Sequence, residues 1–512
     1  MPLPTQDQAW PPPQLAHITP KLNEWAAWWT GNPADLSKAY HGTASPQVED
    51  RPGQHRGGVV GALSRFWWGR PTNAGGQRRD DTHVPLAADI ARASADLLFA
   101  EPLKVAVEQQ AAQDRLDAVL TGDVLSTLTS AAEKTAALGG VYLKTVFDTE
   151  VAESAFLATE PADRAIPEFV HGRLRAVTFW RVLYTDDRQV WRHLERHELL
   201  AGDGVVQHSL YVGTPARLGR PFPLEAHPET APLAGSVNDQ GYITAGITKG
   251  LDVVYIPNKG DGEAKAWRKV PSAAGWGASD YDGAEPFLDD LDQQYASWMR
   301  DIRLGKARII VAKYMLDDLG PGLGAGFDLD RDVYAPLKLA GTEDGDPPIT
   351  PQQFAIRFAE HQATIDQWTD QIIGTAGYSP STFGRDADGA AVTATEVVAR
   401  GDRSTLTRNR NIRGWTPKLQ QILPKLLTVD ASVFGGTVDP TGLTVEFPDG
   451  VNESPETVAR TAQALKMAGA ASTRALVEMV HTDWDDTKVE EEVARIIAES
   501  PTALADPFSF GG

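Results

Sequence analysis

The 512-residue sequence contains no cysteine, and it has no long apolar run. Without cysteine the chain has no disulfide framework, no thiolate ligand for a metal and no cysteine nucleophile. No stretch approaches the ~20 uninterrupted apolar residues that a membrane-spanning helix needs. The opening residues, MPLPTQDQAWPPPQ, are polar and proline-rich, unlike a secretory signal. We therefore expect a protein without a membrane partner that is synthesised and assembled in the cytosol.

The signatures of common enzymes are missing as well. Neither the GxxxxGKS/T phosphate loop nor the GxSxG nucleophile motif occurs. The glycines between Gly322 and Gly326 lack the flanking strand and helix of a dinucleotide-binding fingerprint. The sequence therefore predicts that the chain is not an enzyme. It offers no catalytic residue and predicts no cofactor.

Two short patterns approach metal-site spacing, and both are incomplete. His193 and His197 stand four residues apart, but the HExxH order is absent and the flanks alternate like strands. Ordinary surface histidines are the better interpretation. Asp328 and Asp330 begin an alternation of acids like that of a calcium loop, but Val333 stands where that loop needs glycine. No metal site is predicted.

The charge balance limits how the chain can meet nucleic acid. With 48 basic and 69 acidic residues, the net charge is −21. A protein that grips DNA neutralises phosphates and is basic at its contact surface. This balance argues against tight groove binding and is compatible with a surface along which DNA slides. The plainer interpretation is that acidity only keeps the protein soluble.

The length predicts two to four domains, and the first 285 residues divide at about residue 85. Residues 1–85 are irregular, yet Trp25, Trp28 and Trp29 lie there at helical spacing, so we expect an arm whose short helix packs on the body or on a neighbour. Residues 86–285 form an α+β body. Its expected elements are helices at 86–100 and 114–138, strands at 103–107 and 141–147, and a β-rich stretch at 165–256.

Two helical stripes flank a turn-rich insert, residues 306–350, in the middle of the chain. Their members recur every three or four residues, which places them on one helix face. The first stripe, within 286–305, is Leu288, Leu291, Tyr295, Trp298 and Ile302, and the second, within 351–375, is Phe354, Phe358, His361, Ile365, Trp368 and Ile372. Thr350 and Pro351 predict the start of the second helix. Amphipathic helices usually bury a core face, but the symmetry of these two about the insert favours a protruding module.

A glycine-bearing loop, 376–392, follows the second stripe and leads into a long helix, 393–427. Gly401, Gly414, Pro417 and Pro424 predict kinks or breaks in that helix. Its arginines suit contact with phosphate or with an acidic neighbour, or a solvated face. They are Arg400, Arg403, Arg408, Arg410 and Arg413. A strand within 428–450, three helices within 451–500 and a loose tail, 501–512, complete the chain.

Five segments, taken in their order and spacing, resemble the portal proteins of tailed bacteriophages. The resemblance is to the long-tailed type, and most to the portals of actinobacterial phages. The segments are SADLLFAEP (94–102), LGGVYLKTVFD (138–148), FLDDLDQQYASWMRDIRLGKARIIV (287–311), GYSPSTFG (377–384) and TATEVVARGDRS (393–404).

The resemblance implies an α+β, mainly helical portal fold that assembles as a ring of twelve copies around a channel. The implied parts are an N-terminal arm (1–85), a wing (86–285, with a strand in 428–450), stem helices (286–305 and 351–375), a clip (306–350), a tunnel loop (376–392) backed by the long helix (393–427), and a crown (451–500). The implied location is the unique capsid vertex of a virion assembled in host cytoplasm.

The resemblance also assigns partners and sites. The ring would pass double-stranded DNA without sequence preference and would bind terminase, a head–tail adaptor protein and the major capsid protein. The DNA-facing loop residues would be Ser381, Thr382, Phe383, Gly384, Arg385, Asp386, Asp388 and Gly389. The clip docking residues would be Tyr314, Asp317, Asp318, Phe327, Asp328, Asp330 and Tyr334. The five arginines of the long helix would contact neighbouring subunits.

Two alternatives stay open at the level of sequence. In the first, the chain is a head or neck scaffold that binds only proteins and never touches DNA. In the second, it is a hydrolase with an unrecognised site in the β-rich body. The order of stripe, insert, stripe and loop, together with the missing phosphate loop, favours a passive channel whose motor lies elsewhere.

Overall fold

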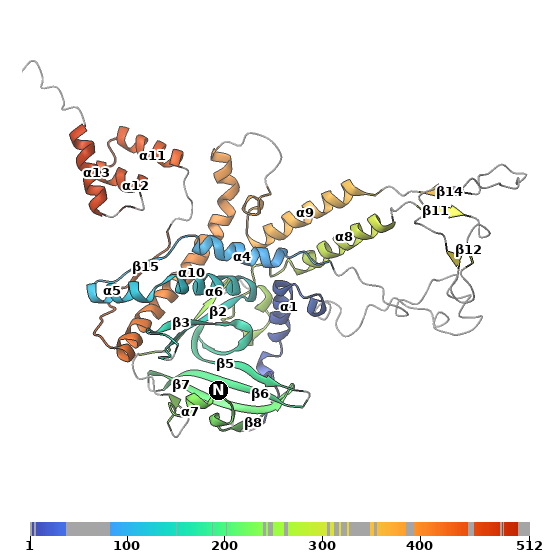
Figure 1. The fold of residues 1–512 in the computed structure, drawn as a ribbon, viewed down its shortest axis with the longest axis horizontal. Coiled ribbons are helices and arrows are strands. Elements are labelled where there is room, and N and C mark those ends of the chain that lie inside the picture. The colour runs from blue at the N-terminus through green and yellow to red at the C-terminus, as the bar shows by residue number, and fades with distance from the viewer. Residues whose placement is uncertain are drawn as a thin grey trace, which may run out of the picture. The chain divides into compact units, whose positions relative to one another are not determined.

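The computed structural model of the chain is mixed α/β with open sheets (Figure 1). The described residues are 3–4, 7–36, 82–149, 151–186, 188–200, 202–238, 242–243, 249–260, 265–304, 308–311, 317–318, 325–326, 349–352, 356–385, 394–448, 455–481, 484 and 486–499. Contacts divide the chain into two units, Met1–Phe447 and Pro448–Gly512.

Helices and strands of the first unit follow the α+β expectation. The helices are α1 (Thr19–Thr30), α4 (Leu86–Phe99), α5 (Gln110–Val119), α6 (Gly122–Leu138), α7 (Ala231–Ala234), α8 (Glu285–Leu304), α9 (Phe358–Ala376) and α10 (Ala394–Phe434). The strands are β1 (Lys104–Ala106), β2 (Gly140–Val146), β3 (Phe156–Pro161), β4 (Ala165–Val170), β5 (Arg173–Thr185), β6 (Val190–Leu200), β7 (Asp203–Thr214), β8 (Arg217–Phe222), β9 (Tyr242–Ile243), β10 (Val253–Pro257), β11 (Arg308–Val311), β12 (Asp317–Asp318), β13 (Ala325–Gly326), β14 (Ile349–Gln352) and β15 (Thr444–Glu446).

A small antiparallel sheet in the order β10-β2-β3 lies at the centre of the first unit. Its central strand β2 is buried on both faces over five consecutive residues, as a strand covered on both sides requires. Helix α6 ends directly before this strand at Gly139, whose φ is +79°. A Cβ there would lie 2.8 Å from the carbonyl oxygen of Gly277, so both the backbone conformation and the packing require glycine.

A larger antiparallel sheet in the order β4-β5-β6-β7-β8 packs beside the small one. Lys144 of β2 links the two sheets through ion pairs with Glu195 of β6 at 2.9 Å and with Glu160 of β3 at 3.1 Å. The Tyr142 and Phe179 rings pack edge to face across the same boundary, with centroids 5.3 Å apart. The β-rich body is therefore one contiguous structure rather than two domains.

The N-terminal segment packs on this body. Trp10 is 6% exposed and meets Trp180 of the larger sheet edge to face, with ring centroids 5.4 Å apart. In α1, Trp25 and Trp28 are 0% and 1% exposed. The short helix predicted from the tryptophan spacing is confirmed, and its apolar side covers its own body. The described part of the segment is thus built into the first unit.

Three predicted helix boundaries are wrong. The helix expected at 114–138 is split into α5 and α6, because Thr121 takes an extended conformation before Gly122. The long helix does not stop at residue 427 but runs through Pro417 and Pro424 to Phe434. Asp430 near its end is fully buried, and it accepts hydrogen bonds from Arg115 and from the backbone N–H of Ala155.

The third error concerns the second stripe, which was expected to begin at 351. Residues 349–352 form β14, in which Pro351 pairs with Ile309 of β11, and α9 begins only at Phe358. Proline suits the first turn of a helix, but it is also tolerated in an edge strand. There the missing N–H faces away from the neighbouring strand, so no hydrogen bond between strands is lost.

The second unit contains the three helices expected near the C-terminus. They are α11 (Pro455–Met467), α12 (Thr473–Val480) and α13 (Asp486–Glu499). The Ser472 hydroxyl caps α12 by accepting a hydrogen bond from the N–H of Ala475 at 3.2 Å.

Replacing Trp25 with phenylalanine should destabilise the first unit. The change keeps most of the apolar volume but removes the indole N–H that donates to buried Glu285 at 2.8 Å. We expect a loss of about 1–3 kcal/mol in the free energy of unfolding, measured by urea denaturation. Trp29→Phe is the matched control, because it removes a similar bond, to half-buried Glu133 at 2.9 Å. Equal losses in the two variants would contradict the role given to Glu285.

Candidate functional site

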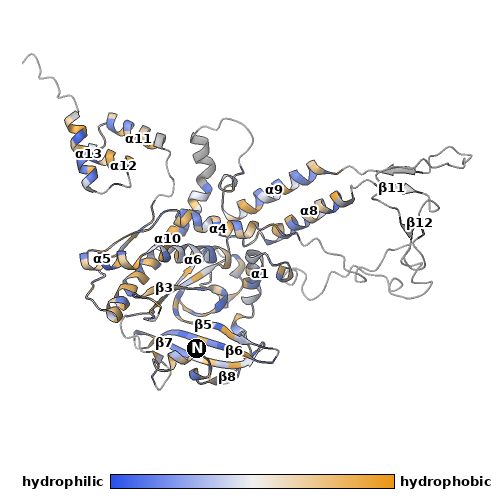
Figure 2. Ribbon diagram, viewed as in Figure 1, coloured by the Kyte–Doolittle hydropathy of each residue, from blue (hydrophilic) through white to orange (hydrophobic). Residues whose placement is uncertain are grey.

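The two predicted stripes form an antiparallel helix pair, α8 and α9, that extends from the body (Figure 1). Polar and apolar residues alternate along both helices (Figure 2). Gln294 of α8 and His361 of α9 are joined at 2.7 Å between Nε2 and Nδ1. The Trp298 ring stacks on the His361 ring, with centroids 6.0 Å apart and planes 10° apart, and meets Phe358 edge to face.

Burial of the stripe residues falls along the pair. Near the body, Leu288 and Leu291 of α8 are each 1% exposed, and Ile372 of α9 is 0% exposed. Tyr295, Trp298 and Trp368 are partly buried, and Ile365 is buried. At the far end Ile302 is 38% and Phe358 is 59% exposed. The described part of the first unit therefore covers the base of the pair and leaves apolar surface uncovered at its far end.

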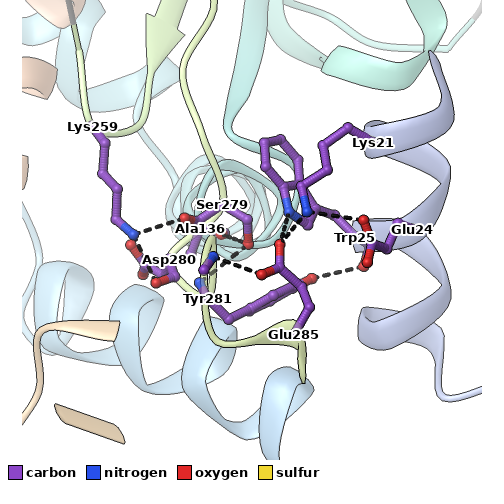
Figure 3. A network of polar contacts seen from close by, with 10 residues as sticks. Lys21, Glu24, Trp25, Ala136, Lys259, Ser279, Asp280, Tyr281 and Glu285 are labelled. Carbon is purple, nitrogen blue, oxygen red and sulfur yellow. Dashed lines mark hydrogen bonds and ion pairs between the residues drawn. The ribbon is translucent and has the colours of Figure 1, made fainter. Parts of the chain in front are cut away.

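The base of α8 is held by a buried carboxylate. Glu285, the first residue of the helix, is 2% exposed. It accepts a hydrogen bond from the Trp25 indole and pairs with Lys21 of α1 at 2.6 Å (Figure 3). The Tyr281 hydroxyl donates to the backbone oxygen of Trp25 at 2.7 Å. These contacts tie the start of α8 to the N-terminal helix.

A second buried carboxylate, Asp280, ties the same segment to the end of α9. Asp280 is 1% exposed, and it accepts hydrogen bonds from the Asn258 amide at 2.9 Å and from the Tyr378 hydroxyl at 2.7 Å. Beside it, the Lys259 ammonium donates to the backbone oxygens of Ser279 and Asp280 (Figure 3). The base of each helix thus connects to this one network.

The far end of the pair is crosslinked by Asp301. Its carboxylate accepts from Arg357 at 2.8 Å and contacts His361 Nε2 at 3.0 Å. The hydrogen bond with His361, followed by that with Arg357, lowers the pKa of Asp301 below its usual range. Beyond this point the chain enters β11 and returns through β14, which pair with each other. The helix pair therefore carries an insert whose two ends are joined.

The turn after α9 is packed on α10 over its described part. Gly377 has a φ of +96° and caps the helix, and Tyr378 is buried. Ser404 of α10 accepts from the Ser379 N–H at 2.9 Å and shares a hydrogen bond with Thr382 at 2.7 Å. Phe383 is partly buried against the hydrophobic core that contains Tyr378. Within the described part of the predicted DNA-facing set, Gly384 is exposed, whereas the other residues are half-buried, namely Ser381, Thr382, Phe383 and Arg385.

Arg385 is held between two aspartates of α9. Its Nη2 lies 2.8 Å from Asp366, and its Nε lies 2.9 Å from Asp370. The hydrogen bond with Arg385 lowers the pKa of Asp366. The preceding helix therefore offsets the charge of Arg385.

The arginines of α10 differ in their surroundings. Arg408 is 9% exposed, and it donates from Nε to the backbone oxygen of Leu97 at 2.7 Å, so it holds α4 to α10. Arg403, Arg410 and Arg413 are exposed along the helix. A role for these three in subunit contact stays a prediction.

Several predicted site residues lie outside the described residues or lack described side chains. They are Tyr314, Phe327, Asp328, Asp330, Tyr334, Phe354, Asp386, Asp388 and Gly389, together with the side chains of Asp317, Asp318 and Arg400. Sequence reasoning missed Asp280, Glu285 and Asp301. Only Asp301 had a usable signal, because it precedes the stripe residue Ile302 and lies near the face that meets His361.

Comparisons with known proteins do not assign the chain to a family. No protein-family model matches the chain, and no curated protein matches it. Similar solved structures are the virion of a native gene transfer agent particle (TM-score 0.37, 12% identity, 77% of this chain and 89% of that chain) and the neck of the native particle computed with C12 symmetry (0.37, 13%, 80% and 89%). A third is the neck of the empty particle computed with C6 symmetry (0.37, 12%, 80% and 90%).

Neither membrane insertion nor a metal centre gains support from the described residues. Among the described helices, none combines the length and apolarity needed to cross a membrane. Within the same residues, no group of three or more His, Cys, Asp or Glu side chains is arranged to hold a metal ion.

The histidines of the larger sheet are buried, so the surface location expected for them is wrong. His193 and His197 are 5% and 3% exposed, and His193 Nε2 lies 3.1 Å from Nδ1 of His208 on β7. Burial, and then their mutual charge, lower the pKa of His193 to about 4, and burial lowers that of His208 to about 4. Burial alone would raise the pKa of Glu195, but the hydrogen bond with His197 and the charge of Lys144 hold it well below its usual range. The cluster is therefore a pair of neutral histidines, His193 and His208, beside the Glu195 carboxylate, which is paired with Lys144 and His197. Such an arrangement stabilises the sheet and does not indicate a catalytic or metal site.

Acidification should destabilise the first unit well above the range where ordinary carboxylates titrate. In the folded chain His193 and His208 stay neutral until about pH 4, whereas unfolded histidine binds a proton near pH 6.5. Their contribution is complete above pH 6.5 and is lost as the pH falls toward 4. Two protons taken up on unfolding give a slope of about 2–3 kcal/mol per pH unit below pH 6.

The measurement is the free energy of unfolding between pH 7 and pH 5. The double variant His193→Gln/His208→Gln should show a flatter profile, and His171→Gln at an exposed position should leave the slope unchanged. A wild-type stability that is constant over this range would contradict the assignment.

Proposed function

We propose that the chain is the portal protein of a tailed bacteriophage or a phage-like particle. In this role it forms a ring of twelve copies at one capsid vertex, the number that the sequence resemblance implies. Double-stranded DNA passes through the ring during packaging and ejection. The chain is a passive conduit, and the energy comes from a separate terminase that docks on it.

The observation that carries the proposal is the order of elements around the helix pair. Two antiparallel helices are anchored at one end, an insert is closed by β11 and β14 at the other, and a packed turn leads into the 41-residue α10. The sequence resemblance assigns to these parts the stem, the clip, the tunnel loop and the helix behind it. The insert is then the surface for terminase and head–tail adaptor, and the remainder of the first unit contacts the major capsid protein.

The charges of the helix pair suit DNA that slides. A fixed unpaired cation would hold a phosphate and act as a brake. Arg385 is instead shared between Asp366 and Asp370, and Arg357 is paired with Asp301 at 2.8 Å. Arg357, directly before α9, and half-buried Arg385, after the turn that follows α9, therefore offer weakened attraction to phosphate. An acidic chain with such paired cations presents a wall along which a polyanion moves without a tight stop.

Purified full-length protein should form closed rings with a central hole when imaged by negative stain at micromolar concentration. Apolar residues exposed at the far end of the helix pair, Ile302 and Phe358, give one reason for association. Mass photometry gives the subunit number. A protein that stays monomeric at high concentration would rule out the ring.

The scaffold alternative makes a different prediction for Arg385. In particles assembled with Arg385→Ala, the channel function predicts less packaged DNA or poorer retention, because Asp366 and Asp370 are left uncompensated in the wall. Arg217→Ala is the matched control, since Arg217 of β8 in the larger sheet is also an ion-paired arginine, bound to Asp7. The measurement is DNA content per particle. Unchanged content with intact assembly would favour a scaffold that never touches DNA.

A further inference from the structure

A cavity of about 410 Å³ opens beside α10. Its walls come from α4, α6, the segment after β10, and α10. Apolar side chains, among them Leu98 and the 3%-exposed Trp415, contribute to its lining. Four cationic residues also line it, namely Lys259, Arg410, Arg413 and Lys418. No carboxylate residue is among the lining residues.

Two of these cations have no partner in the described chain. Lys259 is satisfied by the backbone oxygens of Ser279 and Asp280. Arg410 takes part in interactions of its own. Among the described residues, Arg413 and Lys418 have neither a hydrogen-bond partner nor an ion pair. Burial, followed by the nearby charge of Arg173, lowers the pKa of Lys418, so its ammonium sits where its own chain gives it little compensation.

This concentration of positive charge is unusual for a chain with a net charge of −21. Copies of so acidic a chain repel one another, and assembly requires local patches where opposite charges meet. A cavity of this volume has room for a few side chains rather than a whole domain. Its apolar lining suits an aliphatic or aromatic neighbour, and its cations suit Asp or Glu.

We propose that this cavity receives an acidic segment of a second copy of the chain, with Arg413 and Lys418 pairing with its carboxylates. This inference rests on the proposed self-assembly into a ring. Arg413 and Lys418 are a positive patch on one copy, and the excess of acidic residues on the next copy supplies the complement.

Zero-length crosslinking tests the contact directly. A carbodiimide joins a lysine amine to a carboxylate that touches it, and equal amounts of ¹⁴N- and ¹⁵N-labelled chain distinguish links between copies from links within one. We expect peptides of mixed isotope that join Lys418 to an Asp or Glu. Lys21, which contacts Glu24 of its own helix at 2.9 Å, should give same-isotope links and serves as the internal control. Lys418→Arg should assemble but lose the link.

Charge reversal gives the second readout. Arg413→Glu/Lys418→Glu should raise the concentration for half-assembly at least about tenfold, measured by mass photometry. Arg188→Glu/Lys269→Glu makes the same change in net charge at exposed positions outside the cavity and should assemble normally. Circular dichroism and thermal unfolding establish that both variants fold.

The outcomes separate this inference from the proposed function. Rings in which Lys418 gives no mixed-isotope link would overturn the cavity contact and leave the portal intact. Mixed-isotope links in dimers that never close into rings would support the contact and count against the portal. Charge-reversed rings that assemble normally but bind DNA more weakly would assign the cavity to nucleic acid, and would overturn the inference.

Discussion

The helix pair depends on two carboxylates that are almost fully buried at its base. An ionised carboxylate without partners inside a protein costs several kcal/mol, so Asp280 and Glu285 require donors wherever the chain folds. Those donors come from three places: Trp25 and Lys21 of α1, Asn258 after β10, and Tyr378 after α9. The requirement brings the N-terminus, the small sheet and the end of the helix pair to one point. A segment that is irregular in sequence thereby becomes part of the base.

The interior of the helix pair changes character along its length. Near the base, leucine and isoleucine pack into the body's core and give the pair stability without directional contacts. Farther out, Gln294, His361 and Asp301 form a polar seam beside Trp298. Hydrogen bonds demand a specific register, whereas apolar contacts tolerate sliding. The base therefore holds the pair in place, and the seam fixes how one helix is aligned with the other where the insert begins.

Periodicity predicted what depends on local pattern. The tryptophan helix, the first stripe helix, the α+β body and the three C-terminal helices all follow from spacing that one segment shows by itself. What failed depended on partners distant in sequence. Pro351 was predicted to open a helix, but its strand pairs with β11 some forty residues earlier. The extension of α10 to Phe434 is held by Arg115 and Ala155. The buried histidines looked exposed because alternation alone does not reveal that a second sheet covers one face.

The treatment of positive charge links the proposed channel to the proposed assembly. The cations of the helix pair and those beside α10 have different surroundings. Along the helix pair, Arg385 and Arg357 are neutralised by aspartates of the same pair, so their attraction for a phosphate is weak. Beside α10, Arg413 and Lys418 face a cavity without such partners among the described residues. Paired cations suit a surface past which a polyanion moves. Cations without a partner in their own chain suit a lasting contact between subunits. In a ring, the same chain has to let DNA move past it and hold its neighbours.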